Sequence, residues 1–300
     1  MKIILLLVSL TYAVQGACQQ SDKRKPHHES TRIVYYPTNE TDTLYNHQNE
    51  YFLALFKLAL AKVPNAVMEI KYVSMPSVPQ GRSAALIEEA FYDIHWMVSN
   101  TERETRLAPI RIPLYKGLIG LRLAFVNKNN PDLLADVTSQ AQLQNLVVGQ
   151  GRDWPDTQIL LNSQFNLIAT TNTNALFNLL TIERIDYFPR SVIEIWAEHA
   201  LMQHAKVMVD PHIAIYYPTA VYFFVRKNDM HLHGVIEKGL QIAIDDGSFE
   251  ALFTQHFGGL LKRANLAKRQ IFELDNPFLP KETPLADARL WFDIKATHPE

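Results

Sequence analysis

The chain has 300 residues and a formal net charge of −2, with 29 Lys and Arg against 31 Asp and Glu. This near balance and the lack of a basic tract argue against nucleic acid as a partner, because polyanion binding needs concentrated positive charge. The single cysteine, Cys18, excludes an intramolecular disulfide, which fits a bacterial periplasmic protein better than an animal secreted one.

The first residues have the form of a secretory signal peptide. Lys2 gives a charged start, the run 3–12 is apolar but too short to span a membrane, and small residues follow at Gly16 and Ala17. A leader of this form directs export in bacteria and is then removed. We therefore predict that residues 1–17 are a signal peptide and that the mature protein is periplasmic.

The cleavage point has two alternatives. Cutting before Ala17 gives a free protein, which we favour. Cutting before Cys18 would give a lipid-anchored one, although Gln15 stands where lipoprotein signals usually have an aliphatic residue. The polar residues 18–30 are expected to form a flexible lead-in. The next most apolar stretch, 51–63, is interrupted by two lysines and is expected to be a core helix rather than a membrane span.

Alternating strands and helices follow in two groups. In the first group we predict strands at 32–36, 68–73, 93–98 and 118–127, helices at 50–63 and 83–92, and a helical turn that opens at Thr101. In the second we predict strands at 145–148, 166–169, 185–188, 213–217 and 222–226, and helices at 158–162, 174–180, 191–206, 232–245 and 249–257. This order predicts an α/β protein of mostly parallel sheets flanked by helices, in two lobes with a cleft between them.

Four segments resemble the family-3 solute-binding proteins, which serve bacterial importers of polar amino acids. SNTERE (99–104) resembles the family's segment after its third strand, and residues 112–130 resemble the strand that crosses into the second lobe. VVGQGRDWPDTQILL (147–161) is similar to the Gly-rich turn and helix that open that lobe. Residues 222–258 are similar to the last strand and its two following helices. Their order and spacing carry the resemblance over most of 31–260.

The resemblance implies a two-lobed, type II periplasmic-binding fold, each lobe being a mostly parallel sheet flanked by helices. It places 31–126 and 220–300 in the first lobe and 127–219, with the hinge, in the second, with crossovers near 123–127 and 216–222. The implied function is a monomeric binding protein that closes over a small polar solute and delivers it to a membrane ABC importer permease.

Two other functions remain open on the same scaffold. The cleft could report its ligand to a membrane-bound sensor, which sequence does not distinguish from import. It could also be a lyase or dehydratase, but no paired-acid constellation is identifiable, so we expect a protein that is not an enzyme. We expect no cofactor. The histidines 199, 204, 231 and 233 lack the spacing or the acidic and cysteine neighbours of a zinc site, so we expect no metal.

The position of Arg190 is unusual in the predicted structure. Pro189 is expected to end the strand 185–188, and Ser191 with Glu194 has the spacing of a capping box that opens the next helix. Arg190 would then lie at a helix N-terminus, where the helix dipole disfavours a cation. A bound anion would offset this repulsion.

Arg103 is expected at a second strand end, where the resemblance matches it to the family arginine that clamps the ligand carboxylate. Ligands of open α/β sheets bind outside the carboxyl ends of the strands, and guanidinium groups grip carboxylates bidentately. We therefore expect an anionic, carboxylate-bearing solute between Arg103 and Arg190. The alternatives are ion pairs, to Glu102 or Glu104 for Arg103 and to Glu194 or Asp186 for Arg190.

Other candidate ligand contacts also lie near predicted strand ends. They are Gly151, Asp153 and Thr157 in and after the Gly-rich turn, and Tyr36, Trp96, Trp154 and Tyr187 as apolar walls of a cleft. For Asp153 and Thr157 the alternative is helix capping. For the four aromatic residues it is ordinary packing in the core.

Overall fold

The computed structural model of the protein describes residues 31–39, 43–75, 80–202 and 204–297. The predicted signal peptide, Cys18 and the lead-in lie outside these residues. Within the described ranges, no helix is both long and apolar enough to cross a membrane.

The first lobe contains two small sheets. Its elements are β1 (Arg32–Thr38), α1 (Thr43–Ala61), β2 (Met68–Ser74), α2 (Gln80–Glu88), β3 (Ile94–Val98), α3 (Thr101–Arg106), β4 (Leu107–Ile110), β11 (Val221–Arg226), α8 (Met230–Asp245) and α9 (Ser248–Ala264). β1 pairs with β2 in parallel, and β11 lies between β3 and β4, antiparallel to both. The Asp93 amide donates to the Tyr35 carbonyl at 2.9 Å and so joins the two sheets.

Helix α1 shows how an apolar stripe fixes the first lobe. Phe52, Leu55, Phe56 and Ala59 follow helical spacing and are fully buried. α8 packs against this stripe closely, since a Cβ atom on Gly239 would lie 2.0 Å from the Ala59 carbonyl oxygen. The predicted core helix is confirmed, and it begins earlier than the sequence suggested.

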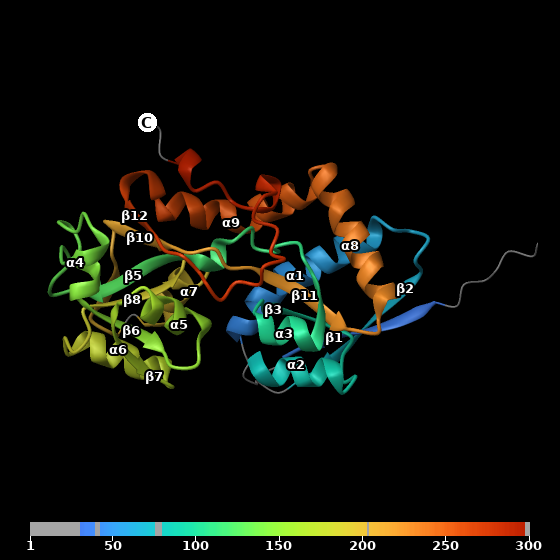
Figure 1. The fold of residues 1–300 in the computed structure, drawn as a ribbon, viewed down its shortest axis with the longest axis horizontal. Helices are drawn as coiled ribbons and strands as arrows, with labels where there is room; N and C mark the ends of the chain where they lie inside the picture. Colours follow the sequence, from blue (N-terminus) through green and yellow to red (C-terminus); the bar gives the residue numbers. More distant parts are fainter. Residues whose placement is uncertain (1–30, 40–42, 76–79, 203, 298–300) are drawn as a thin grey trace, which may run out of the picture.

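The second lobe is built on one seven-stranded sheet (Figure 1). Its strands are β5 (Leu121–Asn127), β6 (Val147–Gly151), β7 (Asn166–Thr170), β8 (Tyr187–Ser191), β9 (Val207–Val209), β10 (Ile213–Tyr216) and β12 (Gln270–Glu273). The order is β12-β10-β5-β8-β6-β7, and β9 pairs with β5. The helices of this lobe are α4 (Gln140–Asn145), α5 (Pro155–Asn162), α6 (Thr173–Thr181) and α7 (Ile195–Leu201).

The predicted two-lobed α/β fold is confirmed, but the sheets are mixed rather than mostly parallel. β5 runs antiparallel to β8, β9 and β10, while β6 is parallel to β7 and β8. The strands that enter a lobe from the other one, β5 and β11, are the ones that run antiparallel to their neighbours. Four short 3-10 helices complete the description: Leu118–Gly120, Leu266–Lys268, Ala288–Leu290 and Lys295–Thr297.

Two crossovers, residues 111–120 and 217–220, connect the lobes. They touch at Gly120, whose carbonyl accepts from the Tyr217 amide at 3.2 Å and where a Cβ atom would lie 2.0 Å from the Tyr217 carbonyl oxygen. The first crossover precedes β5, whereas the sequence placed it near 123–127. Those residues are fully buried in the second-lobe sheet, because the apolar run continues into it.

The end of the chain also differs from the prediction. β12 pairs in parallel with β10 from Ile213–Gln270 to Tyr216–Glu273. Part of the segment 220–300, which the sequence placed in the first lobe, therefore extends the second-lobe sheet. Helix α9 runs along both lobes (Figure 1), and its Phe253 belongs to a continuous apolar core that includes Phe52 of the first lobe and Phe125 of the second.

Strand β8 corrects the predicted position of Arg190. Pro189 does not end the strand but lies opposite Ala124 within it, and Arg190 lies opposite Leu123. The pairing of β8 with β6 is confined to Tyr187, so β8 is paired on one side only beyond that residue. A proline is tolerated there because a missing N–H on a free strand side costs no ladder hydrogen bond.

The helix predicted at 191–206 is shorter than expected. α7 begins at Ile195, and its N-cap residue, Glu194, makes no side-chain cap. The Ser191 hydroxyl instead donates to the Leu118 carbonyl at 2.9 Å, so the expected capping box does not form. Arg190 thus lies in a strand, and the helix-dipole argument for a bound anion beside it does not apply.

Candidate ligand-binding site

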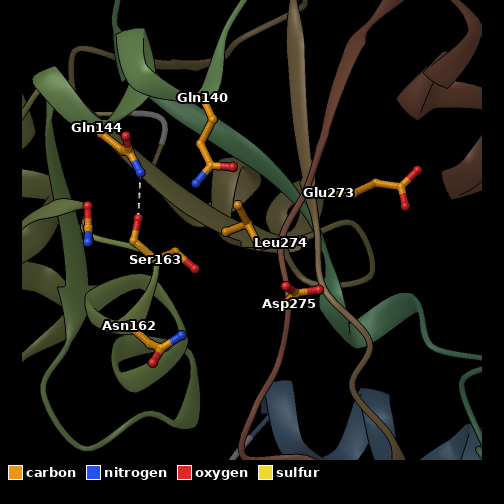
Figure 2. A pocket seen from close by; sticks show the side chains of 8 residues that line it. Gln140, Gln144, Asn162, Ser163, Glu273, Leu274 and Asp275 are labelled. Carbon is orange, nitrogen blue, oxygen red and sulfur yellow. Dashed lines mark hydrogen bonds between the residues drawn. The ribbon is translucent and has the colours of Figure 1, made fainter.

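One pocket of about 330 Å³ opens on the second lobe (Figure 2). Its lining consists of Gln140, Gln144, Asn162, Ser163, Gln164, Glu273, Leu274 and Asp275. These residues come from α4, from the end of α5 and the turn after it, and from the end of β12 and the two residues after it. Gln144 donates to the Ser163 carbonyl at 2.7 Å. None of them is a contact predicted from the sequence. Across the described residues, no group of three or more His, Cys, Asp or Glu side chains could hold a metal ion.

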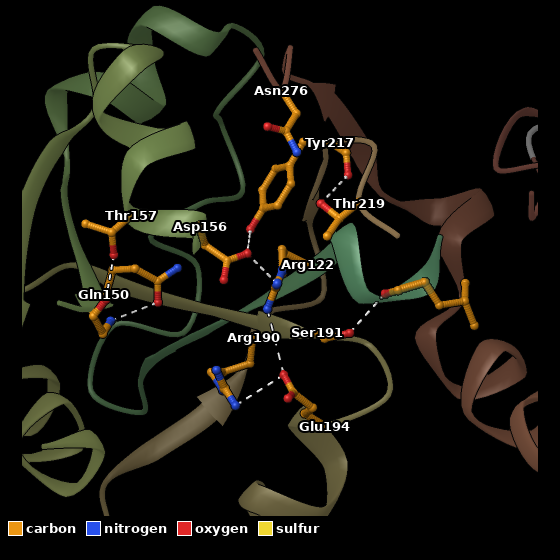
Figure 3. A network of polar contacts seen from close by, with 12 residues as sticks. Arg122, Gln150, Asp156, Thr157, Arg190, Ser191, Glu194, Tyr217, Thr219 and Asn276 are labelled. Atoms are coloured by element: carbon orange, nitrogen blue, oxygen red, sulfur yellow. Dashed lines mark hydrogen bonds and ion pairs between the residues drawn. The ribbon is translucent and has the colours of Figure 1, made fainter. Parts of the chain in front are cut away.

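A buried network of charged side chains lies beside the second crossover (Figure 3). Arg122 of β5 donates to Asp156 in the first turn of α5, and Asp156 also accepts from the Tyr217 hydroxyl. Nη1 of Arg122 lies 3.7 Å from a carboxylate oxygen of Glu194, and Nη2 of Arg190 lies 3.2 Å from the same oxygen. The network therefore runs from the hinge to strand β8.

Arg190 is balanced by two carboxylates. Its Nε donates to Glu198 Oε2 at 2.7 Å and its Nη2 to Glu198 Oε1 at 2.5 Å, in addition to the contact with Glu194. Burial by itself would lower the pKa of Arg190, but the carboxylates of Glu194 and Glu198 raise it above its ordinary value. The pair with Glu194 considered from the sequence forms. Asp186 instead accepts from the Val147 amide at 2.6 Å.

The end of β6, the turn after it and the start of α5 contain four of the predicted contacts. The Trp154 ring lies over the Arg190 guanidinium, with 4.3 Å between its centroid and the guanidinium carbon. A Cβ atom on Gly151 would lie 2.3 Å from the same indole, so only glycine admits this packing. Thr157 donates to the Gly151 carbonyl at 2.5 Å, while Asp153 is exposed beside the turn.

Gln150 is a candidate that the sequence analysis missed. It is fully buried in β6 between Gly149 and Gly151, and its Oε1 accepts from the Gly151 amide at 3.2 Å. Its Nε2 has no hydrogen-bond acceptor among the described residues. Burying an amide donor without an acceptor is costly, so this group has capacity for a further hydrogen bond. Its position between Gly149 and Gly151 was the signal available in the sequence.

Arg103 occupies a different environment, at the carboxyl end of β3. Helix α3 is capped by Asn100, whose Oδ1 accepts from the Arg103 amide at 2.8 Å. The guanidinium donates through Nη1 to the Val98 carbonyl, and the residue is 8% exposed. The helix begins at Thr101 as predicted, with its cap one residue earlier than the capping-box spacing indicated.

Neither ion pair considered for Arg103 forms. Glu102 lies 3.3 Å from Arg106, and Glu104 pairs with Arg111 at 2.5 Å. Burial lowers the pKa of Arg103, and the charge of Glu102 opposes this only in part. Within the described part of the chain, Arg103 is thus a buried guanidinium without a carboxylate in ion-pair contact.

The remaining aromatic candidates have packing roles. The Tyr36 hydroxyl and the Trp96 indole N–H both donate to Asn49 Oδ1, at 2.9 and 3.0 Å. These two residues lie close together in the first lobe, and the polar group of each already donates a hydrogen bond to Asn49. Tyr187 is fully buried in a separate apolar cluster of the second lobe, and its hydroxyl donates to the Leu143 carbonyl at 3.3 Å.

Comparisons with solved structures identify the fold. No protein-family model matches the sequence, and no curated protein does. Among solved structures, the chain is similar to the probable amino-acid ABC transporter extracellular-binding protein ytmK of Bacillus subtilis, with a TM-score of 0.58, 18% identity and coverage of 76% of this chain and 99% of that one. It is also similar to an ancestral arginine-binding protein bound to arginine, with a TM-score of 0.52, 16% identity and coverage of 75% and 98%.

A third similar structure is the periplasmic VFT2 domain of BvgS from Bordetella pertussis, with a TM-score of 0.55, 12% identity and coverage of 75% of this chain and 93% of that one. A histidine kinase sensor domain with similarity to periplasmic binding proteins also matches, with a TM-score of 0.51, 16% identity and coverage of 76% and 96%. At such identities the likeness shows a shared fold. The chain therefore has the two-lobed periplasmic-binding fold that its sequence resemblance implied.

Proposed function

We propose that this chain is an exported solute-binding protein that captures a small carboxylate-bearing solute between its lobes. The observation that carries the proposal is Arg103, a buried guanidinium at the carboxyl end of β3 without an ion-pair partner in the described residues. Open α/β sheets bind ligands at such strand ends. A buried cation is stabilised by an ion pair, so a solute carboxylate would supply what the chain leaves open.

The second lobe supports a solute that is not simply anionic. Figure 3 shows two guanidiniums, Arg122 and Arg190, and two carboxylates, Asp156 and Glu194. Glu198, which pairs with Arg190, adds a third carboxylate and leaves one negative charge in excess. A solute with a carboxylate towards Arg103 and a cationic or neutral polar group towards this network suits both lobes. We infer that Arg190 holds the Trp154 indole in place, rather than gripping the solute.

Delivery to a membrane importer is the favoured role, since similar structures include binding proteins of amino-acid transporters. The similarity to a histidine kinase sensor domain and to BvgS favours a second role, ligand sensing for a membrane signalling protein. Both roles require the same solute site.

The test is a thermal-unfolding screen of the exported protein against zwitterionic amino acids, monocarboxylates, dicarboxylates and neutral polyols. A bound solute raises the unfolding temperature by mass action. We expect stabilisation by carboxylate-bearing compounds in wild type and none in Arg103→Met. Equal stabilisation of both proteins by a neutral compound would contradict the proposal.

A further inference from the structure

We propose that the C-terminal tail, residues 269–297, is a hinge clamp: a third connection between the lobes that fixes the geometry of both crossovers. The proposal follows from the contacts of the tail and does not depend on which solute is bound. In Figure 1 the tail passes from the second-lobe sheet across the middle of the molecule.

The tail begins with an anchor in the second lobe. Arg269 is 6% exposed, and its guanidinium donates to the Ala264 carbonyl at 2.6 Å and to the Ile213 carbonyl at 2.9 Å. β12 follows at once and pairs with β10. The Leu274 amide then donates to the Tyr216 carbonyl at 2.7 Å. Tyr216 is the last residue before the second crossover.

The tail next reaches the second crossover itself. The Asn276 side-chain amide donates to the Pro218 carbonyl at 2.8 Å. Pro218 lies between Tyr217, which touches the first crossover at Gly120, and Thr219, which is buried. The backbone of 217–220 is therefore bounded by the first crossover and by the tail.

The first crossover is held by a tryptophan. Gly117 has a φ of +80°, and a Cβ atom on it would lie 2.7 Å from the Trp291 ring, so the ring packs directly on this backbone. The Trp291 indole N–H donates to the Pro284 carbonyl at 2.9 Å, which fixes the ring. The next amide, that of Phe292, donates to the Lys116 carbonyl at 2.8 Å.

The far end of the tail packs on the first lobe. Leu290 is 7% exposed and belongs to the core cluster that includes α1 and α8. Trp291 also packs against the cluster around Tyr222 of β11. Arg289 makes an exposed ion pair with Asp245 of α8 at 3.1 Å. The tail thus bonds to both lobes and to both connections between them.

This arrangement restricts hinge motion. Domain closure is absorbed by large φ/ψ changes in a few hinge residues. Here the carbonyls of Lys116, Tyr216 and Pro218 all accept hydrogen bonds from the tail, so such changes must break these bonds or move the tail. We therefore expect the wild-type protein without solute to have a narrow range of interlobe distances.

The first test measures that range with two spin labels, at Lys71→Cys in the first lobe and Gln158→Cys in the second, with Cys18→Ser to remove the native thiol. Both labelled positions are exposed. We expect a single narrow distance distribution, which Trp291→Ala broadens. Leu285→Ala, at a tail position that is 53% exposed, is the matched control and should leave the distribution narrow.

The second test measures amide hydrogen exchange without solute. Trp291→Ala should accelerate exchange of the crossover amides of Leu114, Gly120 and Tyr217 by about tenfold or more, which corresponds to a loss of about 1.4 kcal/mol in local opening free energy. Asn276→Ala, which removes one hydrogen bond, should act in the same direction on Tyr217. Unchanged exchange and distances in both variants, or acceleration spread evenly over both lobes, would overturn the proposal.

Discussion

Two arginines at strand ends, one in each lobe, have opposite surroundings. Arg190 in β8 is held by Glu194 and Glu198, whereas Arg103 after β3 has a backbone carbonyl for its guanidinium and no carboxylate in ion-pair contact among the described residues. Both are buried to a similar degree, at 7% and 8% exposure.

The comparison teaches that burial and strand-end position alone do not identify a ligand contact. What separates the two sites is whether the chain itself supplies the counter-charge. We infer that a buried guanidinium paired with the chain's own carboxylates is part of the fold, and propose that one without them binds the solute. Three substitutions and one pH titration test this distinction.

The largest expected effect is on stability, from Arg190→Ala. Removing one partner of a buried ion pair leaves uncompensated charge, here on Glu194 and Glu198, and costs about 3–5 kcal/mol of unfolding free energy. Urea denaturation measures it. Arg152→Ala, at an exposed position in the neighbouring turn, should change stability by less than about 0.5 kcal/mol. If the Arg190→Ala protein is as stable as wild type but binds the solute weakly, Arg190 is a ligand contact and the prediction is wrong.

The next effect is on affinity, from Arg103→Met. Loss of a charged hydrogen-bond partner costs about 1.5–3 kcal/mol, or roughly tenfold to a hundredfold in the Kd of a carboxylate solute. The unfolding free energy without solute should change little, because the variant loses the bond to the Val98 carbonyl but no longer buries a charge without an ion-pair partner. Calorimetric titration and urea denaturation give the two values. Arg106→Met, on the same helix but paired with Glu88 and Glu102, should leave affinity unchanged.

A smaller effect is expected from Tyr217→Phe. This substitution tests whether the Tyr217 hydroxyl, at the hinge end of the charged network, contributes to its stability. Asp156 loses the tyrosine hydroxyl but keeps Arg122, so the cost should be about 1.5 kcal/mol, the lower end for a hydrogen bond to a charged group. Stability unchanged within about 0.5 kcal/mol would show that the hydroxyl contributes no net stabilisation to the network.

The smallest effect concerns His95. Burial lowers its pKa from 6.5 to about 4, and the charge of Arg103 adds to the lowering. Between these two pH values the unfolded chain binds a proton that the folded chain does not, so His95 makes stability fall as pH falls through this window. Arg103→Met should raise the His95 pKa, but not to 6.5, because burial is the larger cause. NMR titration of the imidazole checks this, and an unchanged pKa would contradict it.

Much of the fold could be predicted from local patterns. The apolar spacing of α1 and the alternation of strands and helices are properties of short segments, and those segments have few other ways to bury their side chains. The strand predicted at 185–188 was placed, but its continuation through Pro189 to Ser191 was missed. Proline usually ends a strand, and its tolerance here depends on β8 having one free side beyond Tyr187.

The site was less predictable than the fold. The spacing of Ser191 and Glu194 indicated a local cap, but the Ser191 hydroxyl bonds to the Leu118 carbonyl, which is far away in the sequence. Glu198 of α7 bonds to Arg190, which lies eight residues earlier, and no short-range pattern reports this. By contrast, the packing of Trp154 on Gly151 is local, and the Gly-rich turn was recognisable from sequence.

The position of β11 has a consequence for the order of folding. It lies between β3 and β4, where Val221 pairs with Val98 and Val225 with Ala108, so the three-stranded sheet joins segments that are distant along the chain. All strands of the second-lobe sheet except β12 come between β4 and β11 in the sequence. Contacts of such high contact order form slowly because a long loop must close first. The lobe that begins the chain is therefore expected to finish folding after most of the lobe inserted within it.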